Sequence, residues 1–138
     1  MMDYREINQL TIEEALPLYT AVGWTDYTKN PDTLAKGLQQ LQQCLYHLAA
    51  YDGEQLVGLL RAVGDGVTIV FIQDILVLPD YQRQGIGSTL MTRTLERFSG
   101  VYQCHLLTNQ TEKTRAFYTS LGFKEVSEQA CAAYTFVN

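Results

Sequence analysis

The sequence has no cluster of Lys and Arg residues, and 15 acidic side chains against 10 basic ones leave a net charge of −5. Binding to nucleic acid depends on grouped cations that neutralise phosphates, so the composition argues against a general nucleic-acid surface. An acidic chain more naturally attracts a cationic substrate. The longest apolar runs, such as residues 67–72, are far shorter than the ~20 residues that span a bilayer. We therefore expect no membrane-spanning segment.

Cysteine is scarce, with three residues at positions 44, 104 and 131, an odd number without the spacing of a metal or redox motif. We interpret them as buried free thiols, as in a reducing compartment, and expect no metal site. The first residues also lack a basic segment followed by an apolar core, which is the pattern of a secretory signal. The expected location is therefore the cytoplasm.

What is present is typical of one domain. With 138 residues, of which 46% are hydrophobic, the chain can bury about two-thirds of its unfolded surface in one core. No repeat, low-complexity tract or linker interrupts it, so we expect a single domain over residues 1–138. Apolar periodicity and turn signals predict the order β-α-α-β-β-β-α-β-α-β-β, a mixed α/β (α+β) fold. The last two strands are expected at residues 123–126 and 133–137.

Local signals place several elements. Thr11 and Glu14 have the spacing of a capping box before the first helix. Asp-Gly pairs at residues 52–53 and 65–66 separate apolar segments and predict an antiparallel meander of three strands. Residues 109 and 112, an Asn and a Glu, are expected to cap the last helix, and Gly122 is expected to end it.

A segment with two glycines, YQRQGIGSTLM (residues 81–91), follows this meander and begins a helix. Glycine lets the backbone turn and approach a ligand closely, and the amides at a helix start attract anions. The segment lacks the Gly-Lys-Ser/Thr of a nucleotide-binding phosphate loop, and it lacks the third glycine and distant acidic residue of a dinucleotide fold. It thus predicts an anion-binding loop of another kind, and the alternative is a helix start that needs only tight packing.

In context, residues 75–87, ILVLPDYQRQGIG, resemble the acyl-CoA-binding motif of the GNAT superfamily of N-acyltransferases, Gln/Arg-x-x-Gly-x-Gly/Ala after a strand. Gln82, Gly85 and Gly87 match this motif. A second segment, RAFYTSLGF (residues 115–123), resembles the final helix and turn of the same family. The resemblance covers residues 67–126 and implies a GNAT-like sheet, mixed but mostly antiparallel and flanked by helices.

The resemblance also implies a site for acetyl-CoA as co-substrate. Amides of the loop and helix start would bind its pyrophosphate, and backbone groups of the preceding strand would pair with its pantetheine arm. The cofactor-binding residues implied in this way are Ile75, Leu76, Val77, Arg83, Gln84, Gly85, Ile86, Gly87, Ser88, Asn109 and Phe117. One position departs from the family, which often has Asn where this chain has Thr111, so a hydrogen bond to the cofactor would be weaker or absent.

Two catalytic residues are predicted. Tyr118 lies where the family places a residue against the thiol end of CoA. A phenol at this position would protonate the departing thiolate. The alternative is that Tyr118 is an aromatic packing residue. Asp74 is the expected acceptor of the proton from the amine, because simple strand alternation sets it on one apolar face with Val70, Ile72 and Leu76. A bulge in the strand would change which face Asp74 occupies. The alternative role for Asp74 is that of a structural carboxylate.

Other side chains are weaker candidates. His47 and His105 compete as bases, but a lone His in an apolar strand is more often a core residue. Trp24 and Tyr27 are expected to line the acceptor pocket, with core packing or surface anchoring as the alternative.

The predicted function is direct transfer of an acetyl group from acetyl-CoA to a primary amine, with a small molecule as the expected acceptor. One alternative is a protein N-terminus or lysine as acceptor. Another is a CoA-binding regulatory or interaction module without turnover. Monomer and homodimer both stay open.

Overall fold

The computed structural model describes residues 2–24, 28–39 and 45–137. The chain divides into two compact units, Met1–Leu107 and Thr108–Asn138. Tyr27 and Cys44 lie outside the described ranges. One domain over residues 1–138 stays a prediction.

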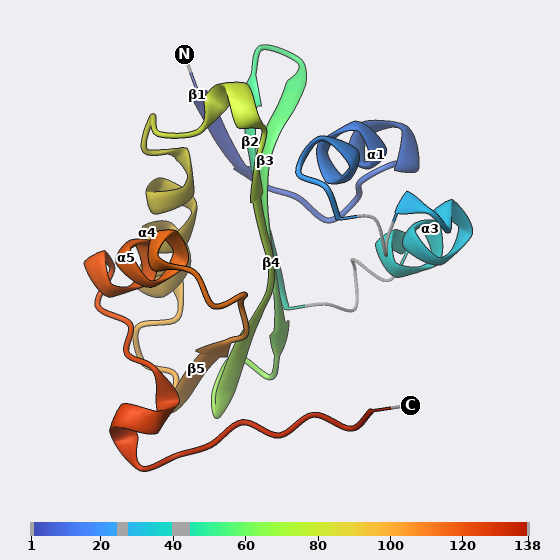
Figure 1. The fold of residues 1–138 in the computed structure, drawn as a ribbon. Helices are drawn as coiled ribbons and strands as arrows, with labels where there is room; N and C mark the ends of the chain where they lie inside the picture. The colour runs from blue at the N-terminus through green and yellow to red at the C-terminus, as the bar shows by residue number, and fades with distance from the viewer. Residues whose placement is uncertain (1, 25–27, 40–44, 138) are drawn as a thin grey trace. The chain divides into compact units, whose positions relative to one another are not determined.

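The first unit is built on a five-stranded sheet with the order β1-β2-β3-β4-β5 (Figure 1). Pairing is antiparallel from β1 to β4, and β5 lies parallel to β4. The strands are β1 (Met2–Glu6), β2 (Tyr46–Asp52), β3 (Gln55–Gly64), β4 (Ile69–Val77) and β5 (Gln103–Leu106). This sheet confirms the predicted meander and the mixed, mostly antiparallel fold.

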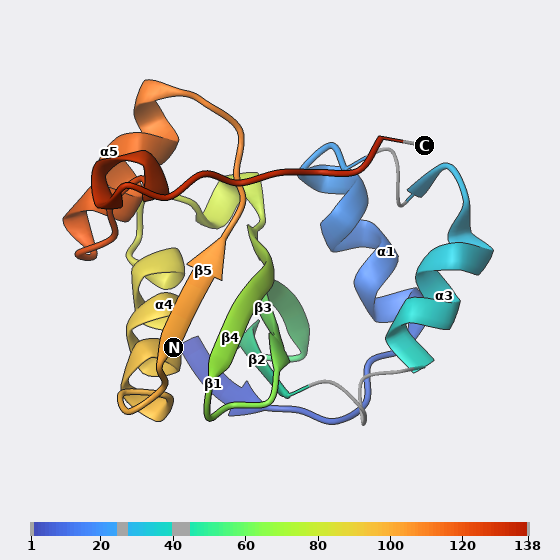
Figure 2. The ribbon, with the colours of Figure 1, turned by 90° about the horizontal axis from the view of Figure 1, so that it is seen from below.

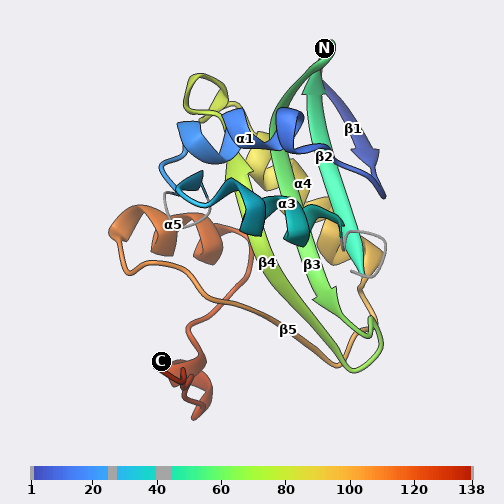
Figure 3. The same cartoon turned by 90° about the vertical axis from the view of Figure 1, so that its right-hand side faces the viewer.

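Helices cover both faces of the sheet. α1 (Ile12–Ala21) and α3 (Pro31–Gln39) lie on one face, and α4 (Ile86–Arg97) lies on the other (Figure 2). Figure 3 shows α1 and α3 in front of the strands. Thr11 is the N-cap of α1 and accepts a hydrogen bond from the N–H of Glu14 at 3.2 Å, as the capping-box spacing predicted. None of the helices in the described ranges is both long and apolar enough to cross a membrane.

Apolar side chains fill the space between the sheet and the helices. The cluster on the face of α1 consists of Leu10, Ala15, Leu18, Tyr19, Leu34, Ala49, Tyr51, Leu56, Leu59 and Leu76. On the opposite face, Gly58 of β3 lets α4 approach closely. A Cβ at this position would lie 3.2 Å from Cγ2 of Ile86 and 3.3 Å from Cδ1 of Leu90. The absence of a side chain at residue 58 therefore lets the first turns of α4 pack closely on β3.

Both predicted Asp-Gly turns are present, between β2 and β3 and between β3 and β4. In the second turn, Oδ1 of Asp65 accepts hydrogen bonds from the backbone N–H groups of residues 67–69 at 2.7 to 3.1 Å. Its Oδ2 accepts from the Thr68 hydroxyl at 2.6 Å. The Thr68 hydroxyl and these amides hold the pKa of the Asp65 carboxyl well below its usual range, so the carboxylate fixes the turn.

The second unit contains α5 (Glu112–Ser120) and a short 3-10 turn at Val126–Gln129. Gly122, with φ 94°, follows the C-cap of α5, as predicted. Its N–H donates to the carbonyl of Thr119, and the N–H of Phe123 donates to the carbonyl of Tyr118, both at 3.0 Å. These two bonds close the end of the helix.

The strands predicted at residues 123–126 and 133–137 are wrong, because the described part of the second unit contains no strand. Figure 1 shows an extended tail after the 3-10 turn. Tyr134 is 96% exposed and Phe136 is 88% exposed. Apolar and aromatic residues favour a strand, but a strand also needs a neighbour that receives its backbone hydrogen bonds. Among the described residues, no backbone hydrogen bond reaches residues 133–137.

Two cysteines fall in the described ranges, and both are free. Cys104 is half-buried in β5, and burial raises the pKa of its thiol. Cys131 is exposed, so the expectation of a buried thiol is wrong there, because it lies in the exposed segment after the 3-10 turn. The described residues contain no group of three or more His, Cys, Asp or Glu side chains that could hold a metal ion.

Candidate active site

A bulge in β4 decides which of its side chains face α1. The register of β3 and β4 pairs Arg61 with Asp74 but Ala62 with Ile72, so Gln73 is an extra residue. Directly paired residues point to the same face, and neighbours along a strand point to opposite faces. Asp74 and Ile72 therefore lie on opposite faces. The expectation that simple alternation sets them together is wrong, and the bulge is the reason.

The face of Asp74 is the one that α1 covers. Leu76, two residues after Asp74, belongs to the buried cluster on this face, as expected. Val70 pairs with Gly64 and lies on the face of α4. The expectation that Val70 shares a face with Asp74 is therefore wrong.

The Asp74 carboxylate is a buried acceptor for two donors. The Tyr19 hydroxyl donates to Oδ2 at 2.8 Å, and Nε of Arg61 donates to the same oxygen and forms an ion pair. The side chain of Asp74 is 1% exposed and that of Arg61 is 12% exposed. Oδ1 of Asp74 is also buried, and it has no hydrogen-bond partner among the described residues. The surroundings are thus polar and charged rather than apolar, and the carboxylate ties α1 to β3 and β4.

Asp74 of β4, Arg61 of β3 and His47 of β2 form a row of polar residues across the sheet, because Arg61 pairs with Asp74 on one side and with His47 on the other. His47 is 2% exposed, and burial together with the Arg61 charge lowers the pKa of its imidazole to about 4. Its ring is therefore neutral at pH 7, as a core residue. His105 lies on β5 with Nε2 3.0 Å from Oε1 of Gln103.

Beyond the bulge, β4 has no β5 partner. The register with β5 begins at Ile69 and ends at Ile72. The N–H of Leu78 donates to the carbonyl of Val57 at 2.8 Å, on the β3 side. Since backbone groups alternate along a strand, those of Val77 and Ile75 point to the opposite edge, where no strand pairs with them among the described residues. The Val77 carbonyl at this edge accepts a hydrogen bond from the side-chain amide of Gln82. An extended ligand can pair with this edge as an added strand would. Of the three strand residues predicted to bind the cofactor, only the middle one turns its amide toward β3.

The segment after β4 turns into an anion-binding loop. A 3-10 turn, η2 (Pro79–Tyr81), comes first, and the side-chain amide of Gln82 donates to the carbonyl of Val77 at 3.0 Å. Arg83 has φ 63° and Gly85 has φ 84°, both in the left-handed region. Gly85 directly precedes the right-handed residues of α4, and a left-handed residue next to right-handed ones makes successive N–H groups converge on one side, as in anion-binding nests. A left-handed Arg is strained, and strain of this kind often marks a functional site.

α4 begins without a side-chain cap. Its N-cap is Gly85, which has no side chain to accept a hydrogen bond. The first backbone bond runs from the N–H of Thr89 to the carbonyl of Gly85 at 2.9 Å. The amides of Ile86, Gly87 and Ser88 thus have no acceptor within the helix and attract an anion. These donors fit a pyrophosphate, and the open edge of β4 fits a pantetheine arm, so the residues present suit acetyl-CoA.

The second unit carries Tyr118 on α5. Its ring packs edge-on against Phe117, with centroids 5.0 Å apart, and against Phe123 at 5.7 Å. Burial raises the pKa of the Tyr118 phenol, while a hydrogen bond with Thr108 lowers it. The net shift is upward, so the hydroxyl keeps its proton at neutral pH and can donate it.

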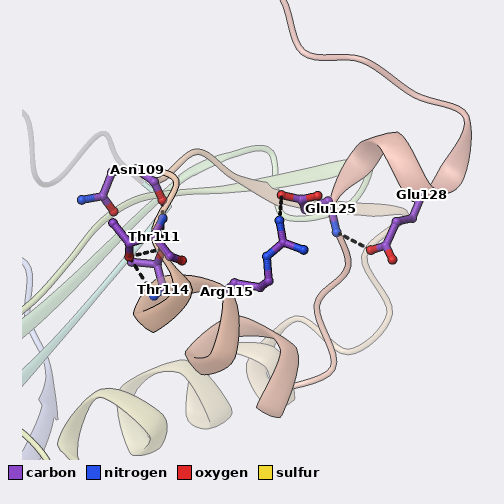
Figure 4. A network of polar contacts seen from close by, with 6 residues as sticks. All are labelled: Asn109, Thr111, Thr114, Arg115, Glu125 and Glu128. Atoms are coloured by element: carbon purple, nitrogen blue, oxygen red, sulfur yellow. Dashed lines mark hydrogen bonds and ion pairs between the residues drawn. The ribbon is translucent and has the colours of Figure 1, made fainter.

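Thr111 caps α5. Its hydroxyl accepts a hydrogen bond from the N–H of Thr114 at 3.1 Å, and the Thr114 hydroxyl accepts from the N–H of Thr111 at 3.3 Å (Figure 4). The prediction that Asn109 and Glu112 cap this helix is wrong, because two threonines make the capping box. Asn109 instead accepts the Thr114 hydroxyl at its backbone carbonyl, 2.9 Å away. The residue that replaces the Asn of the family is therefore already engaged in the helix cap.

Figure 4 also shows how α5 is joined to the segment after it. Nη2 of Arg115 lies 3.3 Å from Oε1 of Glu125, and the N–H of Glu125 donates to Oε2 of Glu128 at 3.1 Å. Both ends of the ion pair are exposed, so we assign it a minor structural contribution.

Trp24 packs edge-on against Tyr19, with ring centroids 5.8 Å apart, and it borders the buried cluster under α1. The sequence interpretation missed Tyr19 and Arg61. Arg61 interrupts the apolar strand LVGLLRAVG, and a charge in such a strand is a signal of a buried partner. No comparable signal marks Tyr19, which occupies an ordinary core position of an amphipathic helix.

Comparisons with known proteins identify the family and the fold. The family model of the GNAT acetyltransferase domain matches residues 43–125. A solved GNAT-family acetyltransferase of Streptococcus pneumoniae TIGR4 is 42% identical, with a TM-score of 0.87 over 100% of this chain and 98% of that one. The structure of AAC(6')-Iy with the bisubstrate analogue CoA-S-monomethyl-acetylneamine is 22% identical, with a TM-score of 0.72 over 100% and 97% of the two chains. The latter likeness shows the fold alone.

Among curated proteins, the chloroplastic GCN5-related N-acetyltransferase 1 of Arabidopsis thaliana is 34% identical over 67 residues, which are 49% of this chain and 34% of that protein. The chain thus aligns with about a third of the length of this relative. The family model, in contrast, spans more than half of the chain itself. On the strength of this match, the chain belongs to the GNAT family of acyl-CoA-dependent acetyltransferases.

Proposed function

We propose that the protein transfers an acetyl group from acetyl-CoA to a primary amine of a small molecule by direct attack. The main support for this proposal is that backbone hydrogen-bonding groups follow one another from β4 through the loop to the start of α4. From the bulge onward, β4 has no strand partner on the β5 side among the described residues, and it leads into the loop of Arg83 and Gly85 and then to the uncapped start of α4. Such a path suits one long ligand with an amide-bearing arm and a pyrophosphate.

The reaction needs one bond formed, one bond broken and two proton movements. The nitrogen of the neutral amine attacks the thioester carbon, and the carbon–sulfur bond breaks. The departing thiolate takes a proton, for which we propose the Tyr118 hydroxyl as the donor. An unperturbed phenol has a pKa of about 10, and the upward shift at Tyr118 keeps it protonated until that step.

The nitrogen loses a proton during the attack, and its two candidate acceptors are Asp74 and water. Oδ1 is the oxygen of Asp74 without a hydrogen bond among the described residues, so it is the atom that could receive the proton. Oδ2 is already engaged by Arg61 and by the Tyr19 hydroxyl, and these contacts hold the carboxylate between α1, β3 and β4. This geometry favours water, with Asp74 in the structural role.

We propose a small cationic amine as the acceptor. The net charge of −5 supports this substrate class. An aminoglycoside acetyltransferase from an uncultured soil metagenomic sample, solved in complex with sisomicin, has the same fold with a TM-score of 0.70. Trp24 and Tyr27 are the proposed acceptor-side residues, and a cytoplasmic location is proposed from the sequence.

The test is an acceptor screen that follows free thiol. The protein is incubated with acetyl-CoA and, separately, with sisomicin, spermidine, free lysine and a lysine-containing peptide. We expect thiol release above background hydrolysis with at least one of the small amines. Release with the peptide alone would point to a protein acceptor. Binding of acetyl-CoA without release in any sample would support a binding module, and absence of binding would contradict the proposal.

A further inference from the structure

We propose that Tyr81 and Asp52 are positioning residues for the loop that binds acetyl-CoA, an inference that rests on the proposed function. The Tyr81 hydroxyl donates a hydrogen bond to Oδ2 of Asp52 at 2.6 Å. Tyr81 ends the η2 turn, two residues before Arg83, and Asp52 ends β2. The bond thus joins the loop to a strand 29 residues away in the sequence. We call this bond the Tyr81–Asp52 brace.

The other side-chain bonds of the loop are local. Gln82 donates to the carbonyl of Val77, and Gln84 donates to the carbonyl of Asp80 at 3.2 Å. Among the described residues, these bonds reach no further than five positions along the chain. The bond of Gln82 attaches the loop to the end of β4, but neither bond reaches another strand.

Packing gives the loop little support on the side of α1. An open cavity of about 360 Å³ lies there, lined by Ala21, Gln55, Leu78, Pro79, Asp80 and Tyr81. A loop beside such a space can shift unless a directed contact holds it. The brace is a contact of this kind at the rim of the cavity.

The need for a brace follows from the backbone of the loop. A left-handed Arg is strained and persists only when its surroundings fix it. A loop that is ordered before binding loses less conformational entropy when the ligand arrives. The brace therefore contributes to affinity for acetyl-CoA without touching it, which is the property of a positioning residue.

A direct electrostatic effect of Asp52 predicts the opposite sign. Asp52, by accepting the hydrogen bond, raises the pKa of the Tyr81 phenol, so the hydroxyl remains a donor throughout the assay range. If the negative charge of Asp52 acted only on the anionic ligand, its removal would strengthen binding. If the carboxylate acts through Tyr81, its removal weakens binding.

The first experiment measures acetyl-CoA binding by calorimetry and kinetics for the Tyr81→Phe variant. We expect the affinity to fall roughly five- to ten-fold, as the loss of one hydrogen bond with a charged partner allows. The KM for acetyl-CoA should rise by a similar factor, with kcat unchanged. Tyr102→Phe is the matched control, since this ring is 83% exposed, and it should bind as the wild type does.

The second experiment separates bracing from charge. Asp52→Ala should lose the same factor as Tyr81→Phe, and the double variant should lose no more than either single one. Asp52→Asn keeps an acceptor oxygen and should retain most of the affinity. Thermal unfolding of each variant verifies that it is folded.

The outcomes separate the inference from the function on which it rests. Wild-type affinity in folded Tyr81→Phe, or tighter binding by Asp52→Ala, would overturn the inference alone. A wild-type chain that binds no acetyl-CoA would overturn the proposed function and this inference with it.

Discussion

Arg61 and Asp74 lie opposite each other on β3 and β4, and they form a buried ion pair in which Nε of Arg61 donates to Oδ2 of Asp74. The bulge at Gln73 brings Asp74 onto the face of α1, where the Tyr19 hydroxyl meets the same oxygen. Two strands and one helix are thus joined at one atom. The stability of the first unit should depend on this contact.

Removal of the positive partner should destabilise the fold strongly. Arg61→Met leaves a buried carboxylate without its ion pair, and such changes cost about 3 to 5 kcal/mol. Urea unfolding measures the loss. The exposed pair of Arg115 and Glu125 provides the control, because Arg115→Met should change the free energy of unfolding by less than about 1 kcal/mol. Equal small losses in both variants would contradict the structural role of the buried pair.

Asp74→Asn separates the two roles of the carboxylate. Since Oδ2 is engaged with Arg61 and Tyr19, we expect a lower melting temperature, with turnover per folded molecule nearly preserved and an unaltered pH profile. Melting temperature, acetyl-CoA affinity and the pH profile are measured on one preparation. A fall in turnover of roughly 10²- to 10⁴-fold, together with loss of the acidic limb, would instead identify Asp74 as the base.

The neutral His47 should make the protein sensitive to acid. Its imidazole has a pKa of about 4 in the folded chain, below the ordinary 6.5, so the unfolded chain binds the proton more readily. The stability that this residue confers is complete above pH 6.5 and is lost as the pH falls from 6.5 to 4. Between pH 7 and pH 5 the loss from His47 should be at most about 2 kcal/mol. Urea unfolding at both pH values tests this, and His47→Gln should flatten the difference.

Tyr118→Phe should reduce turnover without weakening the binding of acetyl-CoA. The ring and its contacts with Phe117 and Phe123 remain, and only the proton donor is removed. A positioned acid contributes roughly 10²- to 10⁴-fold to the rate. Steady-state kinetics and calorimetry provide the two readouts, with Tyr134→Phe as an exposed control. Wild-type turnover in the variant would return Tyr118 to a packing role.

Gly87→Glu should abolish the binding of acetyl-CoA. The amide of Gly87 belongs to the uncapped start of α4, and a carboxylate there adds negative charge where we expect a pyrophosphate. Calorimetric titration of a variant that circular dichroism shows to be folded measures the effect. Unchanged affinity would remove the cofactor assignment of this loop.

The features predicted correctly from the sequence are those with local causes. The cap at Thr11 depends on a residue three positions away, and the turn at Asp65 depends on the next four residues. The turn at Gly85 also has a local cause, because its φ of 84° lies in the left-handed region, which favours glycine. Anion binding by this loop stays a prediction.

The features that escaped prediction depend on distant partners. The β4 bulge exists only in its pairing with β3, and the contact of Tyr19 with Asp74 joins residues 55 positions apart. The tail at residues 133–137 has the composition of a strand, but composition does not supply a neighbouring strand. In each case the sequence shows one partner of an interaction and gives no sign of the other.

Position 58 links the packing of the core to the chemistry of the loop. Any side chain there would press on Ile86, which is the first residue of α4, and on Leu90 one turn later. These two side chains would have to give way by a few tenths of an ångström, and a shift of Ile86 would act on the start of the helix, where the uncapped amides lie. A substitution at this buried glycine that only mildly destabilises the fold would therefore also change ligand affinity. Variants at position 58 should be tested for ligand binding as well as for folding.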